Sequence, residues 1–232
     1  MNIVVLISAN AEWRVVKELF PALNLQTSPF GESADLEFGV WNLKLFHGGW
    51  GKISAAATTQ YVIDQFRPDL LVNLGTCGGF AGRTQTGTTI LVEQTIVYDI
   101  LEQMSDSGEA IAHYSTKLDL SWLDDREPRT VGSGKLIRDL LVSADRDIVV
   151  DDIPMLVEKY GAVAADWESG AIAWVAQRNG TRLLILRGVT DLVGAEGGEA
   201  YGNIALFHTR TRDVMKGLFE QLPYWLESSV VE

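Results

Sequence analysis

Four short stretches of the sequence place ionisable or hydroxyl side chains directly after apolar runs. They are "LISANAEW" with Glu12, "LVNLGTCGGFAG" with Thr76, "VAADWESGAIAW" with Glu168, and "LRGVTDLV" with Arg187, Thr190 and Asp191. Carboxylates can accept hydrogen bonds from sugar hydroxyls, orient a water molecule and exchange protons. Three carboxylates, one guanidinium and the threonine hydroxyls at one place would suit acid–base chemistry on a sugar-like substrate.

Each of these stretches also has a purely structural explanation. An acidic residue in the first turn of a helix, as expected for Glu12 and Glu168, complements the helix dipole. Asp191 could be the N-cap of a helix. A glycine-rich turn after a strand is common, and "GTCGGFAG" has neither GxGxxG spacing nor the lysine of a P-loop. The chemical interpretation therefore depends on all four stretches meeting in one site.

The elements that would bring them together follow from hydrophobic periodicity. Apolar runs predict strands at Ile3–Ser8, Leu70–Leu74, Thr89–Val92, Ala162–Ala165 and Leu183–Val189. Helical spacing predicts helices at Glu12–Leu23, Ile53–Phe66, Trp167–Arg178 and Ala205–Trp225. Such alternation is typical of a mostly parallel sheet covered on both faces, whose strands end at one common edge. We expect one domain over residues 1–232, with the four stretches at that edge.

Two segments depart from this alternation. "DLEFGVWNLKLFHGGWG" alternates in two short runs around Trp41 and Asn42, which predicts a hairpin inserted early in the chain. The polar region from Glu102 to Thr130 is the least regular part and is expected to be a long excursion or a lid.

Composition excludes several classes of partner. The net charge is −12, which opposes binding to nucleic acid or to an anionic membrane surface. A single cysteine, Cys77, and three scattered histidines give neither a disulfide framework nor metal-ligand spacing, so we expect no metal and no cofactor. The apolar N-terminal run is too short for a membrane span and is soon followed by Glu12 and Arg14. A cytoplasmic protein is expected.

Three blocks resemble the nucleoside phosphorylase/hydrolase superfamily, and within it the 5′-methylthioadenosine/S-adenosylhomocysteine nucleosidases. They are "SANAEW", "GGWGKISAAATTQYVIDQFRPDLLVNLGTCGG" and "AADWESGAIAWVAQRNGTRLLILRGVTDLV", in family order and at nearly family spacing. The resemblance implies a single-domain, three-layer α/β/α sandwich with a mixed, mostly parallel central sheet. It also implies hydrolysis of the N-glycosidic bond of a purine nucleoside, with adenine as the expected base.

The resemblance assigns a role to each matching residue. Asp191 would protonate N7 of the leaving base, Glu12 would activate water, and Glu168 would bind the ribose hydroxyls. Thr76 and Arg187 would help to hold that water and the sugar. The remaining positions implied for substrate binding are Gly78, Ile148, Trp167, Thr190 and Trp50.

Residue types also bear on the choice between water and phosphate as nucleophile. Bacterial-type phosphorylases of the superfamily have a phosphate-gripping arginine three residues before the hydroxyl residue of the glycine-rich turn, where this chain has Asn73. Glu12 would in addition repel phosphate, at a cost of roughly 1–4 kcal/mol at surface-like effective dielectric constants. We therefore expect hydrolysis. The alternatives are a purine nucleoside phosphorylase, a nucleosidase for another purine nucleoside such as futalosine, and a nucleoside-binding module without catalysis.

Several positions differ from the nucleosidase pattern. Trp50 stands where a smaller aliphatic residue is usual near the 5′ substituent, and Asp147 replaces an aromatic residue just before Ile148. Asp147 could pair with an exocyclic amine or point to solvent, and either Tyr201 or Phe207 could cap the pocket. The family resemblance further implies a homodimer, in which the stretch around Met104 would reach the partner's pocket.

Overall fold

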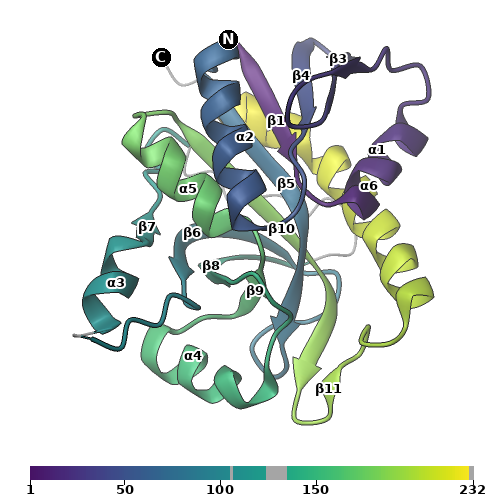
Figure 1. The fold of residues 1–232 in the computed structure, drawn as a ribbon. Helices are drawn as coiled ribbons and strands as arrows, with labels where there is room; N and C mark the ends of the chain where they lie inside the picture. Colours follow the sequence, from purple (N-terminus) through teal and green to yellow (C-terminus); the bar gives the residue numbers. More distant parts are fainter. Residues whose placement is uncertain (105–106, 124–134, 230–232) are drawn as a thin grey trace.

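The computed structural model describes residues 1–104, 107–123 and 135–229, in which strands and helices alternate along the chain (Figure 1). The strands are β1 (Ile3–Ile7), β2 (Gln26–Thr27), β3 (Glu32–Phe38), β4 (Trp41–His47), β5 (Leu70–Phe80), β6 (Thr89–Val97), β7 (Ser115–Lys117), β8 (Leu136–Ser143), β9 (Ala164–Asp166), β10 (Leu183–Gly194) and β11 (Gly197–Gly198). The helices are α1 (Asn10–Leu19), α2 (Gly51–Phe66), α3 (Ser107–His113), the short 3₁₀ helix Val150–Asp152, α4 (Ile153–Tyr160), α5 (Ser169–Arg178) and α6 (Ile204–Ser228).

The strands of the described chain form one mixed sheet in the order β11-β10-β6-β8-β9-β5-β1-β4-β3-β2. Parallel ladders join β4, β1, β5 and β10, and also β6, β8 and β9. Antiparallel ladders lie between these two groups and at the ends of the sheet. Because β10 pairs with both β5 and β6, the strands β10, β6, β8, β9 and β5 close into a ring.

Helices cover both faces of the sheet, as the alternation of side chains along β1 requires. Val4 and Leu6 point to the face covered by α2 and α5, where they pack with Val62 and Ile172. Ile3, Val5 and Ile7 point to the opposite face and pack with residues of α1 and α6. Figure 1 shows the two helix layers on either side of the strands. The predicted three-layer α/β/α fold with a mixed sheet is confirmed.

Two predicted strands are much longer than expected. β5 continues from Leu74 to Phe80 and β10 from Val189 to Gly194, and the two remain paired throughout apart from a register shift between Val189 and Asp191. The sequence "GTCGG" resembled a turn, but its glycines allow the extended backbone to pass close to neighbouring side chains. Thr76 and Asp191 therefore lie within strands, and the suggestion that Asp191 is a helix N-cap is wrong.

Other predictions are confirmed with shifted boundaries. The hairpin consists of β3 and β4 and turns at Gly39 and Val40 rather than at Trp41 and Asn42. Helix α1 begins earlier than expected and ends before Pro21, which disfavours helical backbone at the preceding residue. Strand β8 and helix α4 were not anticipated.

The region expected to be a lid falls partly outside the described residues. Its described part contains α3 and β7, and β7 pairs antiparallel with β6. No described residue between positions 102 and 123 lines the largest cavity at the carboxyl edge of the sheet.

Candidate active site

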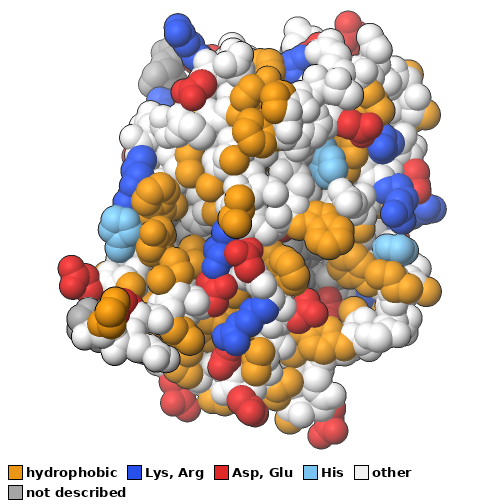
Figure 2. Space-filling model, in the orientation of Figure 1, with side chains coloured by type: hydrophobic (Ala, Val, Ile, Leu, Met, Phe, Trp, Pro, Cys, Tyr) orange, Lys and Arg blue, Asp and Glu red, His pale blue; other side chains and the backbone are white. Residues whose placement is uncertain are grey.

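A cavity of about 800 Å³ opens where the carboxyl halves of β5 and β10 meet the first turns of α1 and α6. Figure 2 shows a hollow in this face of the molecule, with hydrophobic and acidic side chains around it. All the predicted site residues except Arg187 line the cavity: Glu12, Trp50, Thr76, Gly78, Ile148, Trp167, Glu168, Thr190 and Asp191. Stretches separated by up to about 180 positions thus meet in one place, as the sheet-edge argument predicts.

Glu12 is fixed at the floor of the cavity by hydrogen bonds to both of its carboxylate oxygens. Its Oε1 accepts from the backbone N–H of Thr76 at 2.6 Å and from Thr76 Oγ1 at 2.9 Å, while Oε2 accepts from the N–H of Ala9 at 3.1 Å. The third residue of α1 is well placed to bond back to the N-cap N–H, so the start of the helix orients the carboxylate. The side chain is 3% exposed.

Arg187 lies behind the cavity wall and is fully buried. Its Nε is 2.8 Å from Asp166 Oδ2 and donates to Ser169 Oγ at 2.9 Å, and its Nη2 donates to Asn73 Oδ1 at 2.7 Å. Nη1 has no hydrogen-bond partner among the described residues.

Nη1 of Arg187 approaches Glu12 across Gly75. A β-carbon on residue 75 would lie 1.7 Å from that nitrogen and 2.8 Å from Glu12 Oε1. The absence of a side chain at Gly75 therefore permits the guanidinium and the carboxylate to face the same point.

Glu168 is the N-cap residue of α5, one position before the helix in which it was expected. Its Oε1 accepts a hydrogen bond from the N–H of Gly51, the first residue of α2, at 3.0 Å. Burial, reinforced by the nearby charge of Asp166, raises the pKa of Glu168 to about 8, although Arg187 and the Gly51 N–H act in the opposite direction.

Asp191 follows the register shift in β10 and is 6% exposed. Thr190 Oγ1 lies 2.8 Å from Asp191 Oδ1 and donates a hydrogen bond to it. Burial raises the pKa of Asp191 above its ordinary value, and the bond from Thr190 offsets part of that rise. A carboxyl group whose pKa is raised in this way is better able to act as a proton donor near neutral pH.

An apolar wall lies beside these polar groups. Ile148 packs above Gly78, where an added β-carbon would be 2.7 Å from Ile148 Cδ1. Tyr201 donates its hydroxyl hydrogen bond to the Ile148 carbonyl at 2.9 Å, so it spans this end of the cavity. Phe207 and Asp147 also line the cavity. Trp50 forms part of the rim and is 59% exposed.

Sequence reasoning missed two residues that hold Arg187 in place: Asp166, which also lines the cavity, and Asn73, which does not. Asp166 accepts hydrogen bonds from Ser143 and Ser169 and forms the ion pair with Arg187. Asn73, considered only as a missing phosphate ligand, is completely buried and joins Arg187 to the Leu6 carbonyl, to which its Nδ2 donates at 3.1 Å. The signal available in the sequence was a polar residue inside an otherwise apolar strand, at "LVNLG" and "VAADW".

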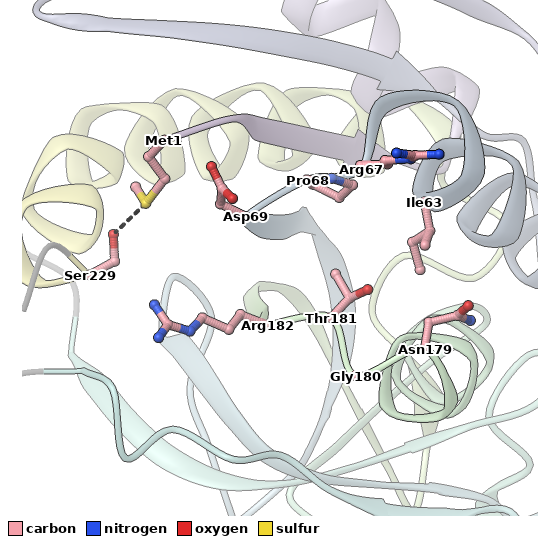
Figure 3. A pocket seen from close by; sticks show the side chains of 10 residues that line it. All are labelled: Met1, Ile63, Arg67, Pro68, Asp69, Asn179, Gly180, Thr181, Arg182 and Ser229. Carbon is pink, nitrogen blue, oxygen red and sulfur yellow. Dashed lines mark hydrogen bonds between the residues drawn. The ribbon is translucent and has the colours of Figure 1, made fainter. Parts of the chain in front are cut away.

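A second cavity, of about 730 Å³, lies near the opposite edge of the sheet, beside the turns that lead into β5 and β10. In Figure 3 its two arginines, Arg67 and Arg182, point away from each other. Its polar groups thus do not converge on one point as those of the first cavity do.

Within the ranges that the structure describes, no cluster of three or more His, Cys, Asp or Glu side chains could hold a metal ion. In the same ranges, no helix combines the length and apolarity needed to cross a membrane.

The model of the phosphorylase superfamily matches residues 3–222 of this sequence. The chain belongs to the phosphorylase superfamily. The resemblance inferred from the three sequence blocks is therefore confirmed.

Superfamily relatives include two curated 5′-methylthioadenosine/S-adenosylhomocysteine nucleosidases. The protein of Marinomonas sp. (strain MWYL1) is 24% identical over 213 residues, covering 87% of this chain and 90% of the relative. That of Thermotoga maritima is 26% identical over 158 residues, covering 67% of this chain and 68% of the relative.

Solved structures of nucleosidases share the fold of this chain. The nucleosidase of Neisseria meningitidis, in complex with methylthio-immucillin-A, superposes with a TM-score of 0.78 at 19% identity, covering 97% of this chain and all of the other. The S-adenosylhomocysteine nucleosidase of Streptococcus pyogenes, in complex with 5-methylthiotubericidin, gives 0.79 at 16% identity, covering 100% and 98%.

Proposed function

We propose that this protein is a nucleosidase that hydrolyses the N-glycosidic bond of an adenine nucleoside such as 5′-methylthioadenosine or S-adenosylhomocysteine. The observation that carries the proposal is the meeting of Glu12, Glu168 and Asp191 in one cavity, each in a different hydrogen-bonding environment. The names of the curated relatives point to the same substrates.

In the proposed reaction, water attacks C1′ of the ribosyl group as the bond between C1′ and N9 breaks. The electron pair of that bond moves to the purine, and Asp191 supplies a proton to N7. Glu12 takes the proton of the water, and the products are free base and the sugar. Carboxylates near an oxocarbenium-like transition state stabilise its positive charge.

The environment of each group suits its proposed role. Three donors hold the Glu12 carboxylate in one orientation. The unpaired Nη1 of Arg187 faces the same point and would donate to the attacking water, with Thr76 beside it. Asp191, whose pKa burial raises, is the group better able to carry a proton to the leaving base.

Glu168 would bind the ribose. Its Oε1 is already paired with Gly51, so Oε2 would accept from the sugar hydroxyls. Gly78, Ile148, Trp167 and Thr190 would surround the base and the sugar.

Phosphorolysis is the main competing activity, and the position of Asn73 argues against it. This side chain points into the protein and is occupied by Arg187 and the Leu6 carbonyl. Phosphate would have to take the place proposed for the attacking water, beside the Glu12 carboxylate, and repulsion between like charges disfavours this. The same three carboxylates argue against a nucleoside-binding module without catalysis.

The 5′ side of the substrate would lie toward the rim that includes Trp50. Its indole ring is large and exposed, so it would contact the 5′ substituent and limit its size. We further propose that the protein works in the cytoplasm as a homodimer and that it contributes to methionine salvage, where such nucleosides are broken down.

A substrate panel in phosphate-free buffer tests the proposed function. The panel would contain 5′-methylthioadenosine, S-adenosylhomocysteine, adenosine, inosine and futalosine, with released base and sugar measured by chromatography. We expect release of adenine and free sugar at a rate that added phosphate does not change. A sugar 1-phosphate as the main product, or no base release from any compound, would contradict the proposal.

A further inference from the structure

The first turn of α2 supplies the donor that holds Glu168, but it has no capping side chain of its own. Trp50 is the N-cap residue and makes no side-chain hydrogen bond to the helix. The first N–H groups of a helix have no partner within the helix and must find acceptors elsewhere. Here the N–H of Gly51 donates to Glu168 at 3.0 Å, and the N–H of Lys52 donates to Asp145 Oδ1 at 2.7 Å.

Lys52, Asp99 and Asp145 form a closed set of contacts around this turn, which we term the α2 clamp. Lys52 Nζ is paired with Asp99 Oδ1 and lies 3.7 Å from Asp145 Oδ2. The backbone N–H of Asp145 donates to Asp99 Oδ2 at 3.0 Å. Asp99 and Asp145 each follow the end of a strand, β6 and β8, by two positions. The α2 clamp thus ties the start of one helix to the segments that follow β6 and β8, the second of which contributes Arg146, Asp147 and Ile148 to the cavity lining.

Two details distinguish this cluster from an ordinary surface ion pair, which contributes little on average. The Lys52 and Asp99 side chains are only 19% and 17% exposed, and each carboxylate also accepts a backbone hydrogen bond. Gly51 has a φ of +77°, and a β-carbon there would lie 2.9 Å from Asp145 Oδ1. The turn is therefore held tightly against Asp145, with a backbone conformation that favours glycine.

We infer that the α2 clamp positions Glu168 for recognition of the ribose hydroxyls. It fixes the Gly51 N–H, which in turn fixes Oε1 of Glu168 and leaves Oε2 for the sugar. Lys52, Asp99 and Asp145 are thus positioning residues, acting on the substrate through Glu168. This inference rests on the proposed function for the identity of the ligand as a ribonucleoside.

The test compares binding of adenosine with binding of 2′,3′-dideoxyadenosine, which lacks the hydroxyls that Glu168 would hold. Isothermal titration calorimetry would measure both ligands with the wild type and with Lys52→Met, Lys52→Arg and Lys44→Met. Lys44 is a matched control, since it is 17% exposed and pairs with Asp35 at 2.7 Å, and it does not line the cavity.

We expect Lys52→Met to weaken adenosine binding by about tenfold, the scale of one lost hydrogen bond. Binding of the dideoxynucleoside should stay nearly unchanged, Lys52→Arg should restore most of the loss, and Lys44→Met should have no effect. Equal losses for both ligands, or equal effects of Lys52→Met and Lys44→Met, would overturn the inference. Should circular dichroism find Lys52→Met unfolded, Asp99→Asn serves for the same comparison.

Binding separates this inference from the proposed function. A wild type that binds adenosine more tightly than the dideoxynucleoside but releases no base from any nucleoside would contradict the nucleosidase proposal. The role of the α2 clamp would in that case still be tested by the binding affinities of the Lys52 variants. A wild type that releases base but binds both ligands equally would overturn the inference alone. A wild type that binds neither would overturn both.

Discussion

Glu12 has a more constrained carboxylate than its position in a first helical turn would require. Dipole complementarity needs only a negative charge near the helix N-terminus. Instead, Thr76 and Ala9 donate to both oxygens, and the side chain is buried at the cavity floor. Burial and orientation of this kind favour the chemical explanation over the purely structural one.

Glu12→Gln should therefore abolish most turnover while nucleoside binding remains measurable. The amide keeps the size of the side chain but cannot take a proton, and general base catalysis is worth about 10²–10⁴-fold in rate. Steady-state kinetics together with calorimetry would separate the two effects. Glu168→Ala, which removes an acceptor for sugar hydroxyls, is the comparison and should weaken binding as well. The same loss of affinity in both variants would count against the division of roles.

Asp191→Asn tests the proton donor. The amide can still donate a hydrogen bond to N7 but cannot deliver a proton, so kcat for adenine nucleosides should fall by about 10²–10⁴-fold or more. A 4-nitrophenyl riboside has a leaving group that needs no protonation and should be much less affected. If both substrates lose activity equally, Asp191 maintains the structure of the site and is not the acid.

The titration of Glu168 should make the free energy of unfolding depend on pH. Its native-state pKa of about 8 lies above the ordinary value of 4.5, so the native state binds more protons than the unfolded state between these values. The free energy of unfolding contributed by this group is therefore greatest at low pH and falls as the pH rises from about 4.5 to about 8. Denaturant titrations across this range should show the fall in the wild type relative to Glu168→Gln. A difference in the free energy of unfolding between the two proteins that does not change with pH would contradict the raised pKa of Glu168.

At the level of elements, β5 is the strand on which the site depends most. Its glycines let side chains from other elements approach the backbone, and at Gly75 a β-carbon would lie within 3 Å of both Arg187 Nη1 and Glu12 Oε1. A strand with ordinary side chains at these positions could not bring α1 and β10 so close together.

Gly75→Ala should accordingly displace Arg187 and abolish most activity, because the new methyl group would lie 1.7 Å from Nη1. Overpacking of a buried position also typically destabilises by about 1–3 kcal/mol. Gly217→Ala is the matched control, since nothing lies within 4 Å of the added carbon on α6, and replacing a helical glycine should stabilise by roughly 1 kcal/mol. Activity assays and thermal unfolding of both variants would check this. A fully active Gly75→Ala protein would refute the close approach.

The elements also mark the limit of what periodicity can predict. Helices α2, α5 and α6 and the apolar halves of β5 and β10 were predictable because their buried faces have a regular spacing. The continuations of β5 and β10 were not, since glycine and polar residues interrupt the apolar pattern where the two strands form the cavity. Asp191 was expected after the end of a strand, with a helix N-cap as the alternative, because a carboxylate after an apolar run resembles a helix cap; it lies inside β10 instead.

For the molecule as a whole, the meeting of these side chains in one site could be predicted, but the buried contacts that hold them there could not. Arg187 forms a hydrogen bond with Asn73, 114 positions away, and an ion pair with Asp166, 21 positions away. No local sequence pattern indicates either contact. Arg187 was expected to help hold the water and the sugar; it does not line the cavity, and its unpartnered Nη1 lies beside Gly75.

Assembly is the remaining question at this scale. Ile53 on α2 and Met104 after β6 are 85% and 97% exposed in the single chain, so contact with a second copy could remove both side chains from water. We expect a homodimer in which the Met104 stretch meets the partner near its cavity. Light scattering at micromolar concentration should give twice the mass of the chain, and Met104→Asp should reduce both dimer and activity. A fully active monomer would exclude this arrangement.

The closed ring of strands has a consequence for how activity is acquired. The bond from Thr76 to Glu12 spans 64 positions and that from Gly51 to Glu168 spans 117, so no hairpin or single helix–strand unit contains all the contacts that hold either carboxylate. Closing such long loops costs conformational entropy, so contacts of this kind form late and slow folding. During refolding, helical signal should therefore return well before catalysis. A chain emerging from the ribosome would have no activity until β10 had been synthesised and had joined β5 to β6.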